Sequence, residues 1–268
     1  MSFLEQATKP VNRLGRKAVA AVAELGYIGL LLLESLYFAI AGWRVGQPVR
    51  VRMVFEQMRQ VGVDAIPIVL LLSFTVGVML GIQFIAALSE FGAENQVVIA
   101  VAKSVTREFA VLITGIVVAG RSGSSFAARI GSMNVSQEVD ALAVIGIEPV
   151  RYLASPALVA MLIMLPVLTI LANGASILGA ALYCSPTLDV SIGAYVVQTL
   201  NSLEPWDIGQ GLAKSFVFAA LITLVGVSTG FSVTGGAEGV GRATTRAVVL
   251  SISALVIADM MFSYFLNR

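Results

Sequence analysis

Charged residues divide the chain into long apolar stretches. Three runs, 65–89, 152–188 and 215–237, contain no Asp, Glu, Lys or Arg. Each is longer than the roughly 20 residues that a helix needs to cross a bilayer core. Two further stretches, 96–120 and 247–266, are apolar apart from a few internal charges. These five stretches predict five transmembrane helices.

The segment from Ala18 to Gly42 is also apolar, but Glu24 and Glu34 leave only residues 25–33 uninterrupted. Basic clusters lie on both sides of it, so a spanning helix would place one cluster on the wrong side of the membrane. We therefore expect an amphipathic helix in the membrane interface. The predicted fold is all-α integral membrane, one domain over 1–268, with a cytoplasmic or interfacial segment (1–60) and a five-helix core (61–268).

With five spans, the loops separate by charge. The loops around residues 90 and 189–207 contain no Lys or Arg. The loops on the side of the N-terminus contain Arg121, Arg129, Arg151, Arg242 and Arg246. Basic loops favour the cytoplasm, so we predict a multi-pass inner-membrane protein whose N-terminus is cytoplasmic and whose C-terminus is periplasmic.

Small residues recur at helical spacing in two of the predicted spans. Gly115, Ala119 and Gly123 lie four residues apart, and Gly77 and Gly81 form a G-x-x-x-G pair. Such stripes lack side-chain bulk and let a second helix approach closely. We interpret these positions as helix-packing surfaces, and self-association of two chains across them as a further possibility.

A polar segment follows the second predicted span, over residues 129–147. Acidic and apolar residues alternate in it, a pattern typical of a short helix that lies across a membrane surface and offers one face to a partner in water. A solvated acidic loop is the alternative, but it would gain nothing from regularly spaced apolar residues. The candidate docking residues are Arg129, Met133, Glu138, Asp140, Leu142 and Glu148.

Ionisable residues inside predicted spans are the other functional candidates. Arg107 and Glu108 lie in an apolar helix, with Lys103 one turn before. Intramembrane charges are costly, and they mark functional sites by default. We interpret Arg107 as functional and Glu108 as its structural partner; the alternative is that Lys103 and Arg107 only extend to the membrane surface. Asp259 in the last span fits either a proton site or a structural carboxylate.

Composition excludes several functions. The chain is 57% hydrophobic and 12% charged with a net charge of +1, and it has no basic run typical of nucleic-acid binding. It has no histidine and one cysteine, so we expect no metal site, no cofactor and no catalytic activity. A G-x-x-x-x-G-K-[ST] motif is absent, so ATP-driven work would need a partner ATPase.

Two motif blocks resemble the MlaE/YrbE permease family. The first contains Arg107-Glu108, AGRSG over 119–123, IGSM over 130–133, EVDAL over 138–142, GIEP over 146–149 and RYL over 151–153; the second is GRATTRAVV over 241–249. The family's E-L-G-P after the Arg-Glu pair is replaced here by Glu108-Phe-Ala-Val, which puts a helix break there in question.

The resemblance implies the membrane subunit of an ABC transporter that works with MCE proteins on lipids. It implies a cytoplasmic ATPase that receives a coupling helix from the 129–147 segment, a periplasmic MCE partner, a second copy of the chain, and room for a small STAS-like cytoplasmic subunit. It also implies a phospholipid cavity, for which the candidates are Lys103, Arg107, Glu108 and Gln83. The alternative function is an ion-coupled secondary transporter that uses Arg107, Glu108 or Asp259.

Overall fold

The computed structural model describes residues 3–42 and 50–266, and this part of the chain is helical without strands. The prediction of an all-α fold is confirmed for these residues. The longer helices are α1 (Phe3–Ala41), α3 (Ile66–Ser89), α8 (Ser155–Thr187), α10 (Pro205–Phe231) and α11 (Gly236–Leu266). The shorter ones are α2 (Val51–Val61), α4 (Val97–Ser104), α5 (Ala110–Val118), α6 (Ser124–Val135), α7 (Glu138–Val144) and α9 (Ile192–Ser202).

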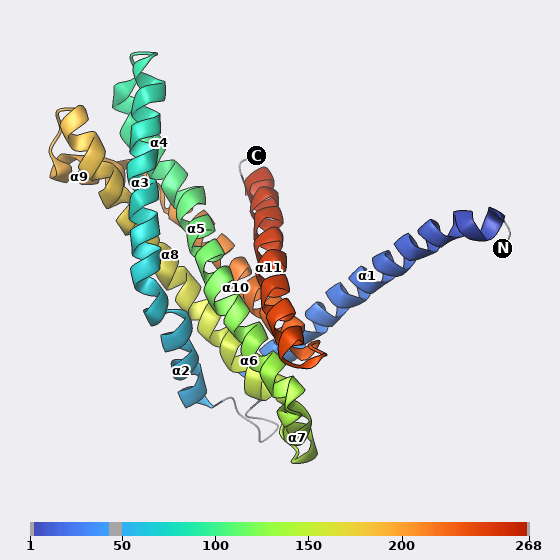
Figure 1. Ribbon diagram of the computed structural model, residues 1–268. Coiled ribbons are helices and arrows are strands. Elements are labelled where there is room, and N and C mark those ends of the chain that lie inside the picture. The colour runs from blue at the N-terminus through green and yellow to red at the C-terminus, as the bar shows by residue number, and fades with distance from the viewer. Residues whose placement is uncertain (1–2, 43–49, 267–268) are drawn as a thin grey trace.

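Three helical turns of π type interrupt the regular helices. They are η3 (Val105–Phe109), η4 (Ala119–Gly123) and η5 (Val150–Ala154), and two short 3₁₀ turns, η1 (Val63–Ala65) and η2 (Glu94–Gln96), precede α3 and α4. Because α4, η3, α5, η4 and α6 follow one another without a gap, residues 97–135 form one continuous helical rod (Figure 1). The helix does not break after Glu108. A π turn inserts an extra residue and changes which way the following side chains point.

The bundle has two ends, which we name after the helices found there. α7 projects from one end, and α9 packs at the other (Figure 1). The rod 97–135 begins at the α9 end and finishes at the α7 end, while α3, α8, α10 and α11 run between the two ends around it. Helix α1 contacts η5, α8 and α10 with its C-terminal part and then leaves the bundle at an angle.

Five helical segments of the described chain are long and apolar enough to cross a membrane: 22–41, 51–89, 150–187, 205–231 and 236–266. The number agrees with the prediction, but the set differs. Segment 22–41 in α1 qualifies by length and composition, and its placement in the interface stays a prediction. The predicted span 96–120 lies largely within the rod, which is not among these five segments. The predicted span 215–237 is shifted, because α10 begins ten residues earlier at Pro205.

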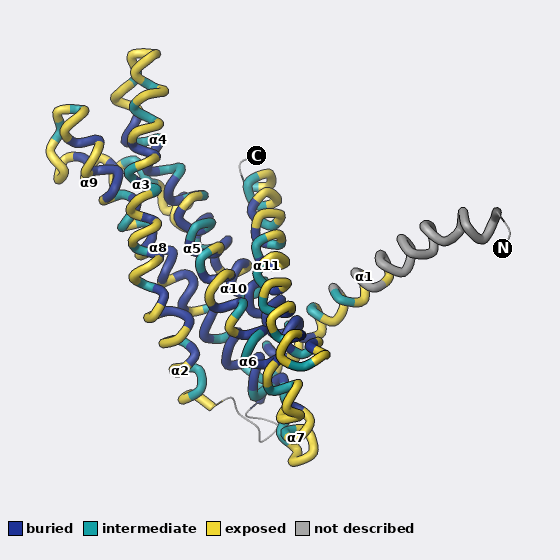
Figure 2. Tube along the Cα trace, in the orientation of Figure 1, coloured by how far each residue is buried: buried dark blue, intermediate teal, exposed yellow. Residues whose placement is uncertain are grey.

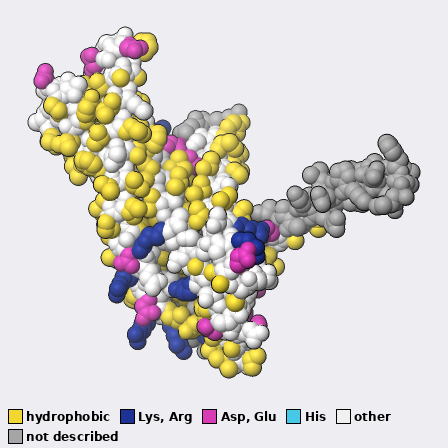
Figure 3. All heavy atoms as spheres, viewed as in Figure 1, with side chains coloured by type: hydrophobic (Ala, Val, Ile, Leu, Met, Phe, Trp, Pro, Cys, Tyr) yellow, Lys and Arg dark blue, Asp and Glu magenta, His cyan; other side chains and the backbone are white. Residues whose placement is uncertain are grey.

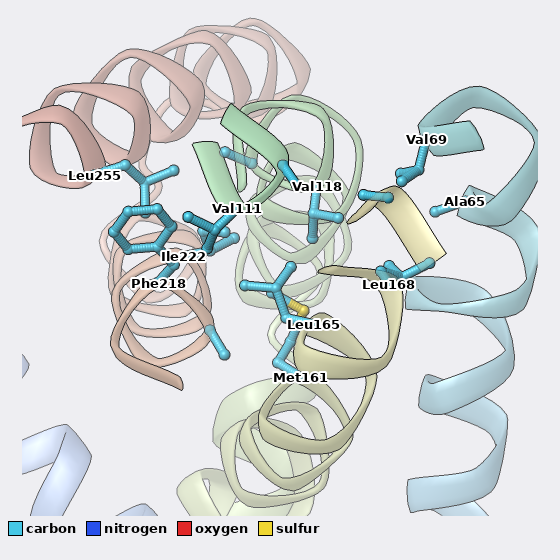
Figure 4. Packing of buried hydrophobic residues seen from close by; sticks show 14 of the residues in the cluster. Ala65, Val69, Val111, Val118, Met161, Leu165, Leu168, Phe218, Ile222 and Leu255 are labelled. Carbon is cyan, nitrogen blue, oxygen red and sulfur yellow. The ribbon is translucent and has the colours of Figure 1, made fainter. Parts of the chain in front are cut away.

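The core lies where α5, α8 and α10 meet. Val111 and Val118 from the rod pack with Leu165 of α8 and with Phe218 and Ile222 of α10 (Figure 4). Burial is greatest along this central seam and falls toward α1, α7 and the outer face of α3 (Figure 2). A single apolar core of this kind fixes the positions of the polar side chains at each end.

Side chains are distributed as expected for a membrane protein. Exposed apolar residues cover the flanks of the bundle, and Lys and Arg gather near the α7 end (Figure 3). The loops at the α9 end, 90–96 and 188–204, contain four carboxylates and no Lys or Arg. The chain is therefore a multi-pass membrane protein with ends of opposite charge character.

Candidate functional site

A buried lysine connects three helices near the α9 end. Lys214 of α10 is 1% exposed, and its ammonium lies 2.5 Å from Glu108 Oε2, 2.9 Å from Asp259 Oδ1 and 3.2 Å from Ser263 Oγ. Ser263 in turn donates to Glu108 Oε1 at 2.8 Å. An ammonium has three N–H donors, and three acceptors surround it. The ammonium donates hydrogen bonds to Glu108 and Ser263 and forms an ion pair with Asp259. These partners explain how a charge can lie inside an apolar bundle.

Arg107 does not pair with its neighbour Glu108. Its Nε donates to Asp207 Oδ1 at 2.6 Å, and its Nη2 lies 2.5 Å from the same oxygen. Asp207 is fully buried, and its other oxygen accepts from the backbone N–H of Glu204 at 2.9 Å, as part of the capping box that begins α10. One carboxylate therefore both caps α10 and orients Arg107.

A cavity of about 560 Å³ opens beside these ion pairs. Lys103, Arg107 and Glu108 line it together with Trp206 and Gln210. Arg107 and Lys103 keep 30% and 33% of their side chains exposed. Among the residues that the structure describes, the ion-pair partner of Lys103 is Glu204, at a distance of 3.9 Å. The structure thus brings together three of the four predicted cavity residues.

Gln83, the fourth, is exposed on α3 and does not line this cavity. Across the whole cluster the charges are nearly balanced. It holds three cations (Lys103, Arg107, Lys214) and four carboxylates (Glu108, Glu204, Asp207, Asp259). Two of these carboxylates, Glu108 and Asp259, share the ammonium of Lys214.

The predicted docking segment is divided between two helices. Glu138 and Asp140 lie exposed in the first turn of α7, and Glu148 is exposed just beyond it. Met133 and Leu142 are half-buried. The larger apolar surface is offered by Val144 and Ile145, which are 86% and 68% exposed. Hydrophobic side chains cover the tip where α7 projects (Figure 3).

Arg129 lies apart from this tip, in α6 against α2. With the Gln57 amide turned so that its oxygen faces the guanidinium, that oxygen lies 2.5 and 3.1 Å from the terminal nitrogens of Arg129. The guanidinium also lies 5.9 Å from the centre of the Phe126 ring. Arg129 therefore contacts α2 and belongs to a different surface from the α7 residues.

The small-residue positions lie at helix contacts inside the chain. A Cβ on Gly77 would come within 1.9 Å of the Ser176 carbonyl oxygen of α8, and one on Gly81 within 2.9 Å of Cys184 Sγ. Gly115 faces Phe218 of α10, Gly123 faces Ile222 of the same helix, and Ala119 is fully buried. Because α10 occupies this stripe, a second copy of the chain would need another face.

Sequence reasoning missed Lys214 and Asp207. The predicted span 215–237 began directly after Lys214, whereas Lys214 lies inside α10. A signal for the true helix start was present: Glu204, Pro205 and Asp207 form a capping pattern with proline in the first turn. That pattern places Lys214 more than two turns inside the helix.

These features define a class of protein: a polytopic helical membrane protein with a charged cavity among its helices and a short helix projecting from one end, as in a membrane permease. The chain belongs to the permease MlaE family, whose model matches residues 54–265. The predicted family resemblance is confirmed.

Relatives come from bacteria and from a plant. The chain is 32% identical over 252 residues to a probable ABC transporter permease protein of Rickettsia felis, covering 94% of this chain and 95% of the relative. It is 31% identical to the intermembrane phospholipid transport system permease protein MlaE of Haemophilus influenzae, covering 94% of both. It is 37% identical to the chloroplastic protein TRIGALACTOSYLDIACYLGLYCEROL 1 of Arabidopsis thaliana over 80% of this chain, but it covers only 61% of that protein. The chain is thus a permease subunit of the ABC-transporter type.

Proposed function

We propose that this chain is the permease subunit of an MCE-type ABC transporter that moves phospholipid between the bacterial inner membrane and a periplasmic MCE protein. The observation that carries the proposal is Arg107, which is held by Asp207 at the edge of a cavity within an apolar bundle. The name of the Haemophilus relative, which specifies phospholipid transport, supports the substrate class.

The geometry of Arg107 suits a phosphate. A guanidinium has five N–H donors, and Asp207 engages Nε and Nη2. Three N–H groups remain for a ligand in the cavity. Lys103 lines the same cavity, and its carboxylate partner in the described part of the chain is distant, so it adds a second positive charge for the phosphate. Asp207 fixes the arginine side chain in advance, which lowers the entropy cost of binding.

Replacement of Arg107 tests this role. Arg107→Ala should reduce bound phospholipid in the purified complex and reduce transfer to the MCE partner, since a charge-assisted hydrogen bond contributes roughly 1.5–3 kcal/mol. Arg107→Lys should recover part of both, because charge is kept while the planar geometry is lost. Arg242→Ala is the matched control: it removes an exposed arginine paired with Glu238 one turn away. Unchanged lipid binding in Arg107→Ala would reject the assignment.

Helix α7 is the proposed coupling helix for the ATPase. The exposed pair Val144 and Ile145 would enter an apolar groove, while Glu138 and Asp140 supply rim charges. Changing Val144 and Ile145 to Asp together should abolish co-purification of the ATPase, and reversing both acidic residues to Lys should weaken it less. Membrane insertion and the thermal stability of the permease should not change. Normal ATPase recovery with the double Asp variant would exclude α7 as the docking element.

Orientation and assembly follow from charge and surface. The arginine-rich α7 end would face the cytoplasm and the acidic α9 end the periplasm, which places the C-terminus outside. We also propose a homodimer with the lipid cavity between the subunits. The apolar residues exposed along α11, such as Val249, Val256 and Met260, support such a contact. Cysteine crosslinking at Val256 should trap the dimer, and a monomeric active complex would refute it.

One observation favours a second candidate, an ion-coupled carrier. Glu108 and Asp259 share the single ammonium of Lys214, and carboxylates inside a membrane are typical of ion-transport pathways. The two functions use different energy sources. A carrier would move its substrate when a proton gradient is applied without ATP, and a permease of the ABC type would not.

A further inference from the structure

A second polar cavity, of about 310 Å³, lies at the α7 end between α2 and the rod. It is separate from the Arg107 cavity, and none of its lining residues belongs to the Lys214 cluster. Its polar lining consists of Gln60, Asp64, Arg121, Ser122, Ser125 and Arg129. Two of the six are arginines.

Arg129 brings a positive charge that no carboxylate of the described chain neutralises. Its terminal nitrogens contact the neutral amide of Gln57. Its Nε is buried and has no hydrogen-bond partner among the residues that the structure describes. A buried donor without an acceptor is costly, and a bound acceptor would relieve that cost.

Arg121 has a weak carboxylate partner. Its Nη1 donates to the Gln60 carbonyl at 2.8 Å, and its Nη2 lies 3.7 Å from Asp64 Oδ2. That second distance exceeds hydrogen-bond range, and both side chains are more than one third exposed. Exposed pairs of this kind contribute little. With two arginines and one carboxylate, the cavity carries an excess of positive charge.

The cavity lies where both of its walls change from polar to apolar. The run 65–89 begins directly after Asp64, and residues 109–120, which precede Arg121, also contain no charge. Ile68, one turn beyond Asp64, and Ile116, on the rod before Arg121, are exposed. Helices α3 and α5 contact each other. An apolar surface therefore continues from the charged cavity toward the middle of the bundle.

We propose that this cavity binds a phosphate group through Arg121 and Arg129, with the hydroxyls of Ser122 and Ser125 as additional donors. Guanidinium and hydroxyl groups are the donors that phosphate oxygens prefer. The phosphate could belong to a phospholipid headgroup or to a free phosphate ion. The adjoining apolar surface favours the lipid, whose acyl chains would lie along it. The site goes beyond the proposed transport function, because it does not involve Arg107.

Native mass spectrometry of the purified full-length protein tests the site with two probes, dihexanoyl phosphatidylglycerol and inorganic phosphate. Arg121→Gln and Arg129→Gln should each weaken binding of the phosphatidylglycerol probe by about tenfold or more, the loss expected for one charge-assisted contact. Arg242→Gln, an exposed arginine at the same end of the bundle, should bind like the parent. Arg107→Gln alters only the Arg107 cavity. Its result therefore separates binding at the Arg121 and Arg129 site from the proposed transport function.

The two probes identify the source of the phosphate. Loss of phosphatidylglycerol binding in both variants supports a lipid headgroup, and loss of inorganic phosphate binding alone supports a free ion. Because Arg129 also holds α2 through Gln57, a melting curve accompanies each variant, and the exposed Arg121→Gln decides the case if Arg129→Gln unfolds. Parent-like binding of both probes in Arg121→Gln would overturn the proposal. So would variants that lose the ATPase partner while keeping both probes, since the arginines would then dock a protein.

Discussion

Replacing Lys214 by methionine removes the one ammonium that holds Glu108 and Asp259 together. Methionine keeps most of the length of the lysine side chain but lacks the terminal ammonium. The carboxylates of Glu108 and Asp259 and the Ser263 hydroxyl would then face an apolar group. Removing one partner of a buried ion pair costs about 3–5 kcal/mol. Glu108 keeps 29% of its side chain exposed, and water can partly solvate it there. We therefore expect a loss near the lower limit, about 3 kcal/mol.

The assay is thermal unfolding of the detergent-purified protein, with a compensating variant as the control. Lys214→Met alone should melt well below the parent. Lys214→Met combined with Glu108→Gln and Asp259→Asn removes all three charges and should recover most of the stability, because neutral groups of similar shape leave no uncompensated charge. If Lys214→Met melts like the parent, the ammonium does not stabilise the three-helix contact, and the account of the cluster is wrong.

Three further substitutions, the first with a matched control, test the packing and the site. Gly179→Ala should destabilise by about 2 kcal/mol in the same melting assay, because its Cβ would lie 2.2 Å from a backbone oxygen of α3; Gly174→Ala on the same helix meets nothing within 4 Å and should be neutral or slightly stabilising. Ser263→Ala should cost about 1 kcal/mol through the lost hydrogen bond to the cluster, and an unchanged melting temperature would contradict it. Asp207→Asn should release Arg107 from its fixed position, so bound phospholipid should fall although the arginine remains, and parent-like lipid retention would argue against a positioning role.

The sequence was sufficient for the spans that depend on long uninterrupted apolar runs. Segment 65–89 and all but the last residue of 152–188 lie within candidate spans, because a charge-free stretch of that length has few alternatives to crossing a membrane. The four-residue spacing of Gly115, Ala119 and Gly123 likewise predicted a close helix contact, and these residues lie against neighbouring helices or in the core. Local patterns of this kind need no knowledge of distant partners.

The charged cluster could not be predicted in the same way. Lys214 is 106 residues from Glu108 and 49 from Ser263 along the chain, so no local pattern shows that its charge is satisfied. A lysine at the edge of an apolar run therefore indicated a span boundary. The π turns also have no compositional signal. Yet η3, η4 and η5 contain Arg107, Arg121 and Arg151, and the extra residue in each turn alters where such side chains point.

ATP-dependent lipid transfer from reconstituted proteoliposomes tests the central claim most directly. Vesicles that contain this permease, its ATPase and labelled phospholipid are mixed with the soluble part of the MCE partner, and transfer is followed with ATP, without ATP, and with an imposed proton gradient. The account predicts transfer that requires ATP hydrolysis and decreases strongly in Arg107→Ala but not in Arg242→Ala. Transfer driven by the proton gradient without ATP, and lost on Glu108→Gln, would contradict it and identify an ion-coupled carrier.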